Sequence, residues 1–332
     1  MDSNLYMGAD KEVMKRFNYK RVARWIIIVA IFVFLGKMLW DNWSQVKEAP
    51  FTFESFPLIL STLVFILSYF IQIWAWYLIT SKLSIALPLL ETLESWFYSQ
   101  FGKYLPGKVW LLLGRFYFYE SKGKSRRGIS IGLYLETVTS IMAAGLIFVV
   151  ALILFKEGLF YSGKQLWWLI LLFLFAFISL HPRVLQKMLS WLLIQFKREP
   201  ISLPISYLDI LWILFVCIMA WVVGGIGFYL FVDSIFPVSP HRILFLTGAL
   251  AFSSVLGLIA IFAPSGLGVR EGILVYLLSY IMPGSVAVVI SILTRIWMTL
   301  IEIGLTGVVY LLGQLQKGST RRNEDVQTGK DS

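Results

Sequence analysis

Three charged residues lie deep inside runs that are otherwise apolar. Glu136 lies within residues 128–155, and Arg295 and Glu302 lie on one helical face within residues 286–312. A charged side chain near the centre of a membrane helix costs roughly 2.5–3.5 kcal/mol on insertion scales. We therefore expect Glu136 to meet Arg295, either as a buried ion pair that fixes helix register or as part of a site for a polar headgroup.

A basic group of residues surrounds an interruption at Pro106 and Gly107. Lys103 and Lys108 lie on either side of it, and Arg115 follows two turns later. Helix ends at such a break present unpaired backbone amides, which together with Lys and Arg favour an anion such as phosphate. The alternative is that these long side chains only reach the membrane surface.

A second interruption carries adjacent opposite charges. Gly266 and Gly268 follow Pro264, and Arg270 and Glu271 come directly afterwards. The turn lacks the Gly-Lys-Ser/Thr ending of a nucleotide-binding loop, so ATP is not expected here. These charges either take part in a headgroup site or cap the helix ends of a conformationally demanding turn.

Catalytic residues, a metal site and a cofactor are not predicted. Cys217 is the single cysteine, and His181 and His241 are the two histidines. This excludes a disulfide framework and a cysteine-based metal site. Both histidines lie beside loops, where interfacial residues are expected.

The composition tells which elements must position these residues. The chain has 332 residues, of which 58% are hydrophobic and only 14% are charged, and its mean hydropathy is +0.77. These values exclude a soluble protein and predict an all-α polytopic membrane protein. Runs that could cross a bilayer predict six full spans, at residues 22–40, 56–78, 128–155, 166–180, 208–232 and 286–312.

Two further apolar stretches, residues 87–119 and 243–282, contain the two interruptions. Proline and glycine should end one helix and begin another there. Such backbone is tolerated at membrane depth only where protein or a wet cavity surrounds it. We therefore predict two re-entrant hairpins.

The net charge of +10 is explained by membrane topology, and no nucleic-acid partner is expected. With two hairpins, 22 of the 29 Lys and Arg residues fall in segments on one side, which the positive-inside rule makes cytoplasmic. The expected organisation is a basic N-terminus at residues 1–21, one transmembrane domain at residues 22–314 and a polar tail at residues 315–332. We expect a multi-pass protein of the cell (inner) membrane with both termini in the cytoplasm.

An internal repeat is suggested by an offset of 158 residues, which aligns Pro106 with Pro264 and Gly114 with Gly272. In the predicted topology the two hairpins open to opposite sides, which makes the repeat inverted. Broken helices at corresponding positions of inverted halves predict a binding site between the halves.

The two interruptions carry a resemblance to a known family. The run Tyr-Leu-Pro-Gly-Lys-Val-Trp at residues 104–110, Gly114-Arg115, Leu135-Glu136 and the run Pro-Ser-Gly-Leu-Gly-Val-Arg-Glu-Gly at residues 264–272 together resemble the lysylphosphatidylglycerol synthase transmembrane region. Ser265 stands where glycine is expected. The resemblance implies a flippase-like helical module with re-entrant helices that moves an amphipathic lipid between leaflets; stand-alone relatives are linked to polyprenyl-linked glycan or hopanoid pathways.

The aminoacyl-transfer domain found in multiple peptide resistance factors is not expected here, so the word "synthase" is not carried over as an activity. The leading hypothesis is a translocase for a phospholipid or polyprenyl-linked lipid, with a separate lipid-modifying or glycan-synthesis enzyme as a possible partner. Its expected headgroup site comprises Lys103, Lys108, Arg115, Glu136, Arg270, Glu271, Arg295 and Glu302. The alternatives are a membrane transferase that uses Glu91, Glu94 or Glu120, and a non-transporting partner in envelope synthesis.

Overall fold

The computed structural model is helical in the part of the chain that it describes. It describes residues 40, 51, 53–104, 109–154, 171, 181–195, 205–260, 263 and 266–328. No strand occurs among these residues, as expected for an all-α membrane protein.

Four of the six expected spans are confirmed as helices that are long and apolar enough to cross a membrane. They are α3 (Ser55–Lys82), α6 (Arg126–Leu154), α9 (Tyr207–Asp233) and α12 (Gly284–Thr328). The spans expected at residues 22–40 and 166–180 lie outside the described residues, apart from one helical position in each.

Both interrupted stretches are broken helices, as the Pro and Gly residues predict. The first consists of α4 (Leu89–Gln100), η1 (Phe101–Tyr104) and α5 (Val109–Ser121). The second consists of η2 (Pro240–Arg242), α10 (Ile243–Ile259) and α11 (Val269–Leu278). The segment Pro240–Ile259 is itself long and apolar enough to cross a membrane, whereas α11 has only 10 residues. The re-entrant path of both stretches stays a prediction.

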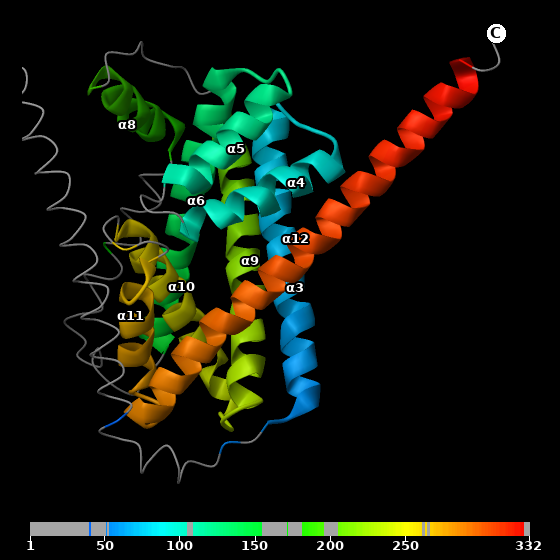
Figure 1. The fold of residues 1–332 in the computed structure, drawn as a ribbon. Helices are drawn as coiled ribbons and strands as arrows, with labels where there is room; N and C mark the ends of the chain where they lie inside the picture. The colour runs from blue at the N-terminus through cyan, green and yellow to red at the C-terminus, as the bar shows by residue number, and fades with distance from the viewer. Residues whose placement is uncertain are drawn as a thin grey trace, which may run out of the picture.

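Close packing between α3 and α9 forms the centre of the bundle. Small residues allow it: the Ser61 hydroxyl donates a hydrogen bond to the Gly227 carbonyl at 2.8 Å, and Gly224 faces Ser68. Helix α6 packs against α9 and α10. Figure 1 shows α3 and α9 upright beside one another, with α12 crossing them obliquely.

Helix α12 is longer than the apolar run within it. The expected span covers residues 286–312, but the helix has 45 residues and continues to Thr328. Its C-terminal part projects away from the bundle (Figure 1). The segment expected as a polar tail therefore continues the last span as helix over most of its length.

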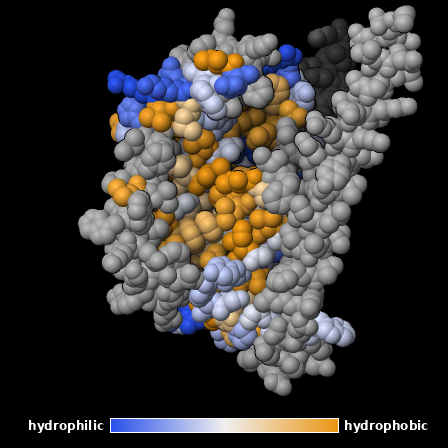
Figure 2. Space-filling view, turned by 90° about the vertical axis from the view of Figure 1, so that its left-hand side faces the viewer, coloured by the Kyte–Doolittle hydropathy of each residue, from blue (hydrophilic) through white to orange (hydrophobic). Residues whose placement is uncertain are grey.

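The surface has the distribution expected for contact with lipid. Figure 2 shows apolar side chains across the middle of one face, with more hydrophilic residues above and below them. The amphipathic helix α8 (Pro182–Gln195) exposes Trp191 and Ile194 while it buries Leu185, a pattern typical of a helix that lies on a membrane surface.

Candidate functional site

Among the described residues of the first broken stretch, Arg115 on α5 is the most enclosed cation. Its side chain is 4% exposed, and Nη1 donates to Oε2 of Glu136 on α6 at 2.5 Å. The guanidinium carbon lies 4.8 Å from the Trp76 ring centroid and 5.9 Å from that of Trp96, a geometry in which aromatic faces attract a cation. Nε donates to the Ser99 hydroxyl at 3.4 Å. A carboxylate, two aromatic rings and a hydroxyl thus stabilise the buried charge of Arg115.

In the second broken stretch, the buried charged residue of an ion pair is the carboxylate of Glu271. Its Oε2 accepts a hydrogen bond from the Gly268 amide at 2.6 Å and so caps the start of α11. Its Oε1 accepts from Arg295 on α12. The Ser291 hydroxyl donates to the Glu271 carbonyl at 3.3 Å. The interpretation of Glu271 as a helix cap is confirmed.

The expected pairing of Glu136 with Arg295 is wrong. Each of these residues pairs with a charge on the short helix that precedes its own span, namely Arg115 for Glu136 and Glu271 for Arg295. The partners are 21 and 24 residues apart, so consecutive helices can neutralise the charges locally. The spacing between charges after each break and charges in the following span was the signal that could have predicted this.

Arg270 lies between α10 and α12. Its Nη2 contacts Sδ of Met298 at 3.2 Å, and a Cβ added at Gly257 would lie 2.9 Å from the Arg270 Cβ. A methionine sulfur is only a weak acceptor. Arg270 is therefore a site cation whose guanidinium contacts a neutral group.

The turn before Arg270 needs glycine. Gly266 has φ +65° and Gly268 has φ +81°, which is the region that L side chains rarely adopt. A Cβ on Gly266 would also lie 2.6 Å from the carbonyl oxygen of Gly257 on α10. The turn therefore folds back closely onto α10. Pro106, Gly107, Lys108 and Pro264, which belong to the same predictions, lie outside the described residues.

A third ion pair connects the first broken stretch to the last span. Lys103 on η1 pairs with Oε2 of Glu302 on α12. The Tyr69 hydroxyl on α3 donates to Oε1 of the same carboxylate at 3.0 Å. Two separate parts of the chain, α3 and η1, thus converge on Glu302, the third charged residue that the sequence places inside an apolar run.

These contacts follow one face of α12. Arg295, Glu302, Thr306 and Gly313 recur at spacings of 7, 4 and 7 residues, so they lie on one side of the helix. We call this the inward face of α12. It faces Glu271 near its start and Lys103 further along, and it spans about 27 Å at 1.5 Å per residue. A bilayer's hydrocarbon core is about 30 Å thick.

A family model described as the lysylphosphatidylglycerol synthase TM region matches residues 26–304. The chain belongs to this family. The match includes both broken stretches and all three of these ion pairs. Comparison with curated proteins gives no match. Membership in the lysylphosphatidylglycerol synthase TM region family, together with the apolar helices, makes this a multi-pass membrane protein related to lipid handling.

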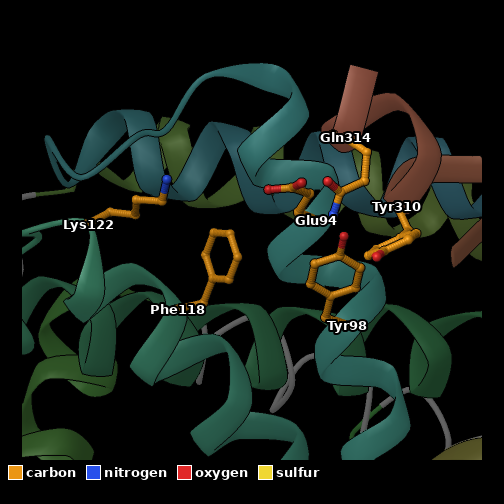
Figure 3. Close-up of a pocket in the computed structure, with 7 residues that line it drawn as sticks. Glu94, Tyr98, Phe118, Lys122, Tyr310 and Gln314 are labelled. Atoms are coloured by element: carbon orange, nitrogen blue, oxygen red, sulfur yellow. The ribbon is translucent and has the colours of Figure 1, made fainter. Parts of the chain in front are cut away.

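In this member of the lysylphosphatidylglycerol synthase TM region family, a pocket lies at the Gly313 end of the inward face of α12. Its volume is about 240 Å³. Figure 3 shows side chains from α4, from α5 with the residue after it, and from α12 around it. The labelled lining residues are Glu94, Tyr98, Phe118, Lys122, Tyr310 and Gln314. The sequence places Glu91, Glu94 and Tyr98 on one helical face, a polar stripe that predicts a wet groove. The contribution of α12 to the pocket was not predicted, because it depends on how α4 and α12 pack together.

Other carboxylates near this pocket are engaged. Glu91 pairs with Lys122 at 2.7 Å, and Glu120 pairs with Arg126. Within the described part of the chain, no three His, Cys, Asp or Glu side chains form a group that could hold a metal ion. Of the three carboxylates considered for a transferase, two are thus held in ion pairs.

Proposed function

We propose that the protein moves an amphipathic lipid between the two leaflets of the cell membrane, with the headgroup travelling along the inward face of α12. The observation that carries the proposal is the length of this face. The residues Arg295, Glu302 and Thr306, together with Gly313 beside the Glu94 carboxylate, span about 27 Å, close to the thickness of the hydrocarbon core. Membership in a family related to lipid handling supports the same function.

A headgroup needs such a path because an unpaired charge in hydrocarbon is very costly. Lys103 is held by Glu302, and a lipid phosphate can replace this carboxylate as the partner of Lys103. Charge-assisted hydrogen bonds of this kind are strong. Arg270 and Arg295 offer further cations along the same face. The anionic part of the lipid can thus pass from one cation to the next.

The arrangement of the two broken stretches supports the inverted repeat in this proposal. In each stretch, a short helix after the break carries a charge that pairs with the following long helix. The sign of the charge is reversed between the two. In the proposed topology the stretches enter the bilayer from opposite faces, both termini are cytoplasmic, and the lipid is supplied by a separate enzyme.

The test is lipid scrambling in liposomes that contain the purified protein and a headgroup-labelled fluorescent phospholipid. A membrane-impermeant quencher removes only the outer-leaflet signal unless lipids exchange. We expect the wild type to expose the inner-leaflet label, and K103M/E302Q to slow exchange at least about tenfold, which is about 1.4 kcal/mol in the barrier.

K82M/D209N is the matched control, since it also removes one ion pair. Lys82 and Asp209 pair at 2.8 Å, with exposed fractions of 51% and 26%. This control should exchange lipid at the wild-type rate. If K103M/E302Q is equally fast while its abundance and folding are normal, the headgroup does not pass this pair. A chemically modified lipid would favour a transferase, and no exchange by the wild type would favour a non-transporting partner.

A further inference from the structure

Glu94 stands apart from the other carboxylates of the bundle. It is 9% exposed and lies on α4 at the wall of the pocket. Of the side chains that the structure describes, none forms a hydrogen bond or ion pair with its carboxylate, whereas Glu91, one turn earlier, holds Lys122. A buried carboxylate without a partner is unfavourable. The pocket therefore lacks one positive charge.

The pocket walls are suited to an organic cation. Tyr98, Phe118 and Tyr310 surround it (Figure 3), and aromatic faces attract cations. Lys122 is already paired with Glu91, so the ionised groups at the pocket sum to one negative charge. An ionised carboxylate only accepts hydrogen bonds, so the ligand that satisfies Glu94 has to donate them.

We propose that this pocket binds a primary ammonium group, with Glu94 as its counter-ion. The volume of about 240 Å³ is below the range of pockets for drug-sized ligands, so it fits a small amine and not a whole lipid. Three of its residues, Tyr310, Gly313 and Gln314, lie beyond residue 304, where the family match ends. The site is thus built partly by a segment outside the matched region.

The ammonium group can belong to a free amine or to a lipid headgroup. Only the second source rests on the proposed function, in which the headgroup would enter or leave the inward face of α12 here. Binding and translocation are therefore measured separately, binding in detergent micelles and translocation in liposomes.

The binding experiment is calorimetric titration of the purified full chain in a neutral detergent. The probes are ethanolamine and dihexanoyl phosphatidylethanolamine, with ethylene glycol and dihexanoyl phosphatidylglycerol as comparators without an amine. We expect saturable binding of at least one amine probe and at least a tenfold weaker affinity in E94Q. The control E120Q removes the same charge from the surface pair with Arg126 and should bind as the wild type does.

A second variant leaves the carboxylate in place. A Cβ at Gly313 would overlap Oε1 of Glu94, so G313A forces this carboxylate to turn and should also weaken amine binding. G304A is its control, because a Cβ at Gly304 meets no atom within 4 Å. G313A decides the question if E94Q does not fold.

Equal binding by wild type, E94Q and G313A would overturn the proposal, as would equal binding of the amine probes and their comparators. Binding of ethanolamine without binding of the short-chain lipid would support a site for free amines and overturn the lipid source. Loss of amine binding in E94Q together with absent scrambling by the wild type would support the pocket and refute the translocase.

Discussion

The buried pair between Arg115 and Glu136 allows a quantitative test of how this bundle is held together. Replacing Arg115 by Met or Glu136 by Gln removes one charge and keeps the side-chain length similar. Each single variant leaves the remaining partner charged, with exposed fractions of only 4% and 15% respectively for Arg115 and Glu136. The variant R115M/E136Q removes both charges at once.

Removing one member of a buried ion pair costs about 3–5 kcal/mol. We expect E136Q at the lower end, because the Arg115 guanidinium that it leaves charged keeps the aromatic rings and the Ser99 hydroxyl as neighbours. R115M should cost about 1–2 kcal/mol more, because it also removes the attraction between the guanidinium and the rings of Trp76 and Trp96. The double variant should be markedly less destabilised than the sum of the single variants, since no unpaired charge remains.

The measurement is reversible unfolding in mixed micelles of increasing denaturing-detergent content, followed by tryptophan fluorescence. A double-mutant cycle then gives the coupling energy, expected near the top of the 0.5–3 kcal/mol range for contacting residues. The same cycle at the exposed pair of Lys82 and Asp209 should give about 0.2–1 kcal/mol. Strictly additive effects at Arg115 and Glu136 would refute the inference that they neutralise each other.

Three further predictions concern packing. G266A should lower the thermal unfolding midpoint, since it places a side chain at positive φ at a cost of about 1–2 kcal/mol and against Gly257; G272A, which has open space, should be milder, and equal shifts would contradict the described turn. S61A removes a buried hydrogen bond between α3 and α9 and should cost about 1 kcal/mol in the same unfolding assay, so an unchanged stability would argue against that contact. Cys217 is buried and should react with a water-soluble maleimide only after denaturation; rapid labelling of the folded protein, followed by mass spectrometry, would be incompatible with its burial.

Local patterns predicted the helices well. Four spans and both interruptions were expected because hydropathy and the backbone effects of Pro and Gly act within a few residues. The continuation of α12 to Thr328 was not expected, since a polar segment was interpreted as a tail on composition alone. Its Gln, Arg and Glu residues have good helix propensity, which composition does not express.

The contacts of the site were less predictable. Glu136, Arg295 and Glu302 were identified as unusual because each is costly inside an apolar run. Their partners depend on how helices approach one another in space, and the match by sequence offset gave the wrong partner for Glu136. The convergence of Tyr69 and Lys103 on Glu302 joins residues separated by about two thirds of the chain, which no local pattern encodes.

The inward face of α12 has a mechanical consequence. The helix contains no proline between Gly284 and Thr328, and the ion pair between Lys103 and Glu302 holds it near its middle. Arg295 lies about 10 Å from Glu302 along the helix, and Gly313 lies about 17 Å from it in the other direction. If α12 tilts as a rigid helix about Glu302, the segments at Arg295 and at Gly313 move in opposite directions. The space beside one segment would then widen while the space beside the other narrows, so that the headgroup path would not be open at both ends at once.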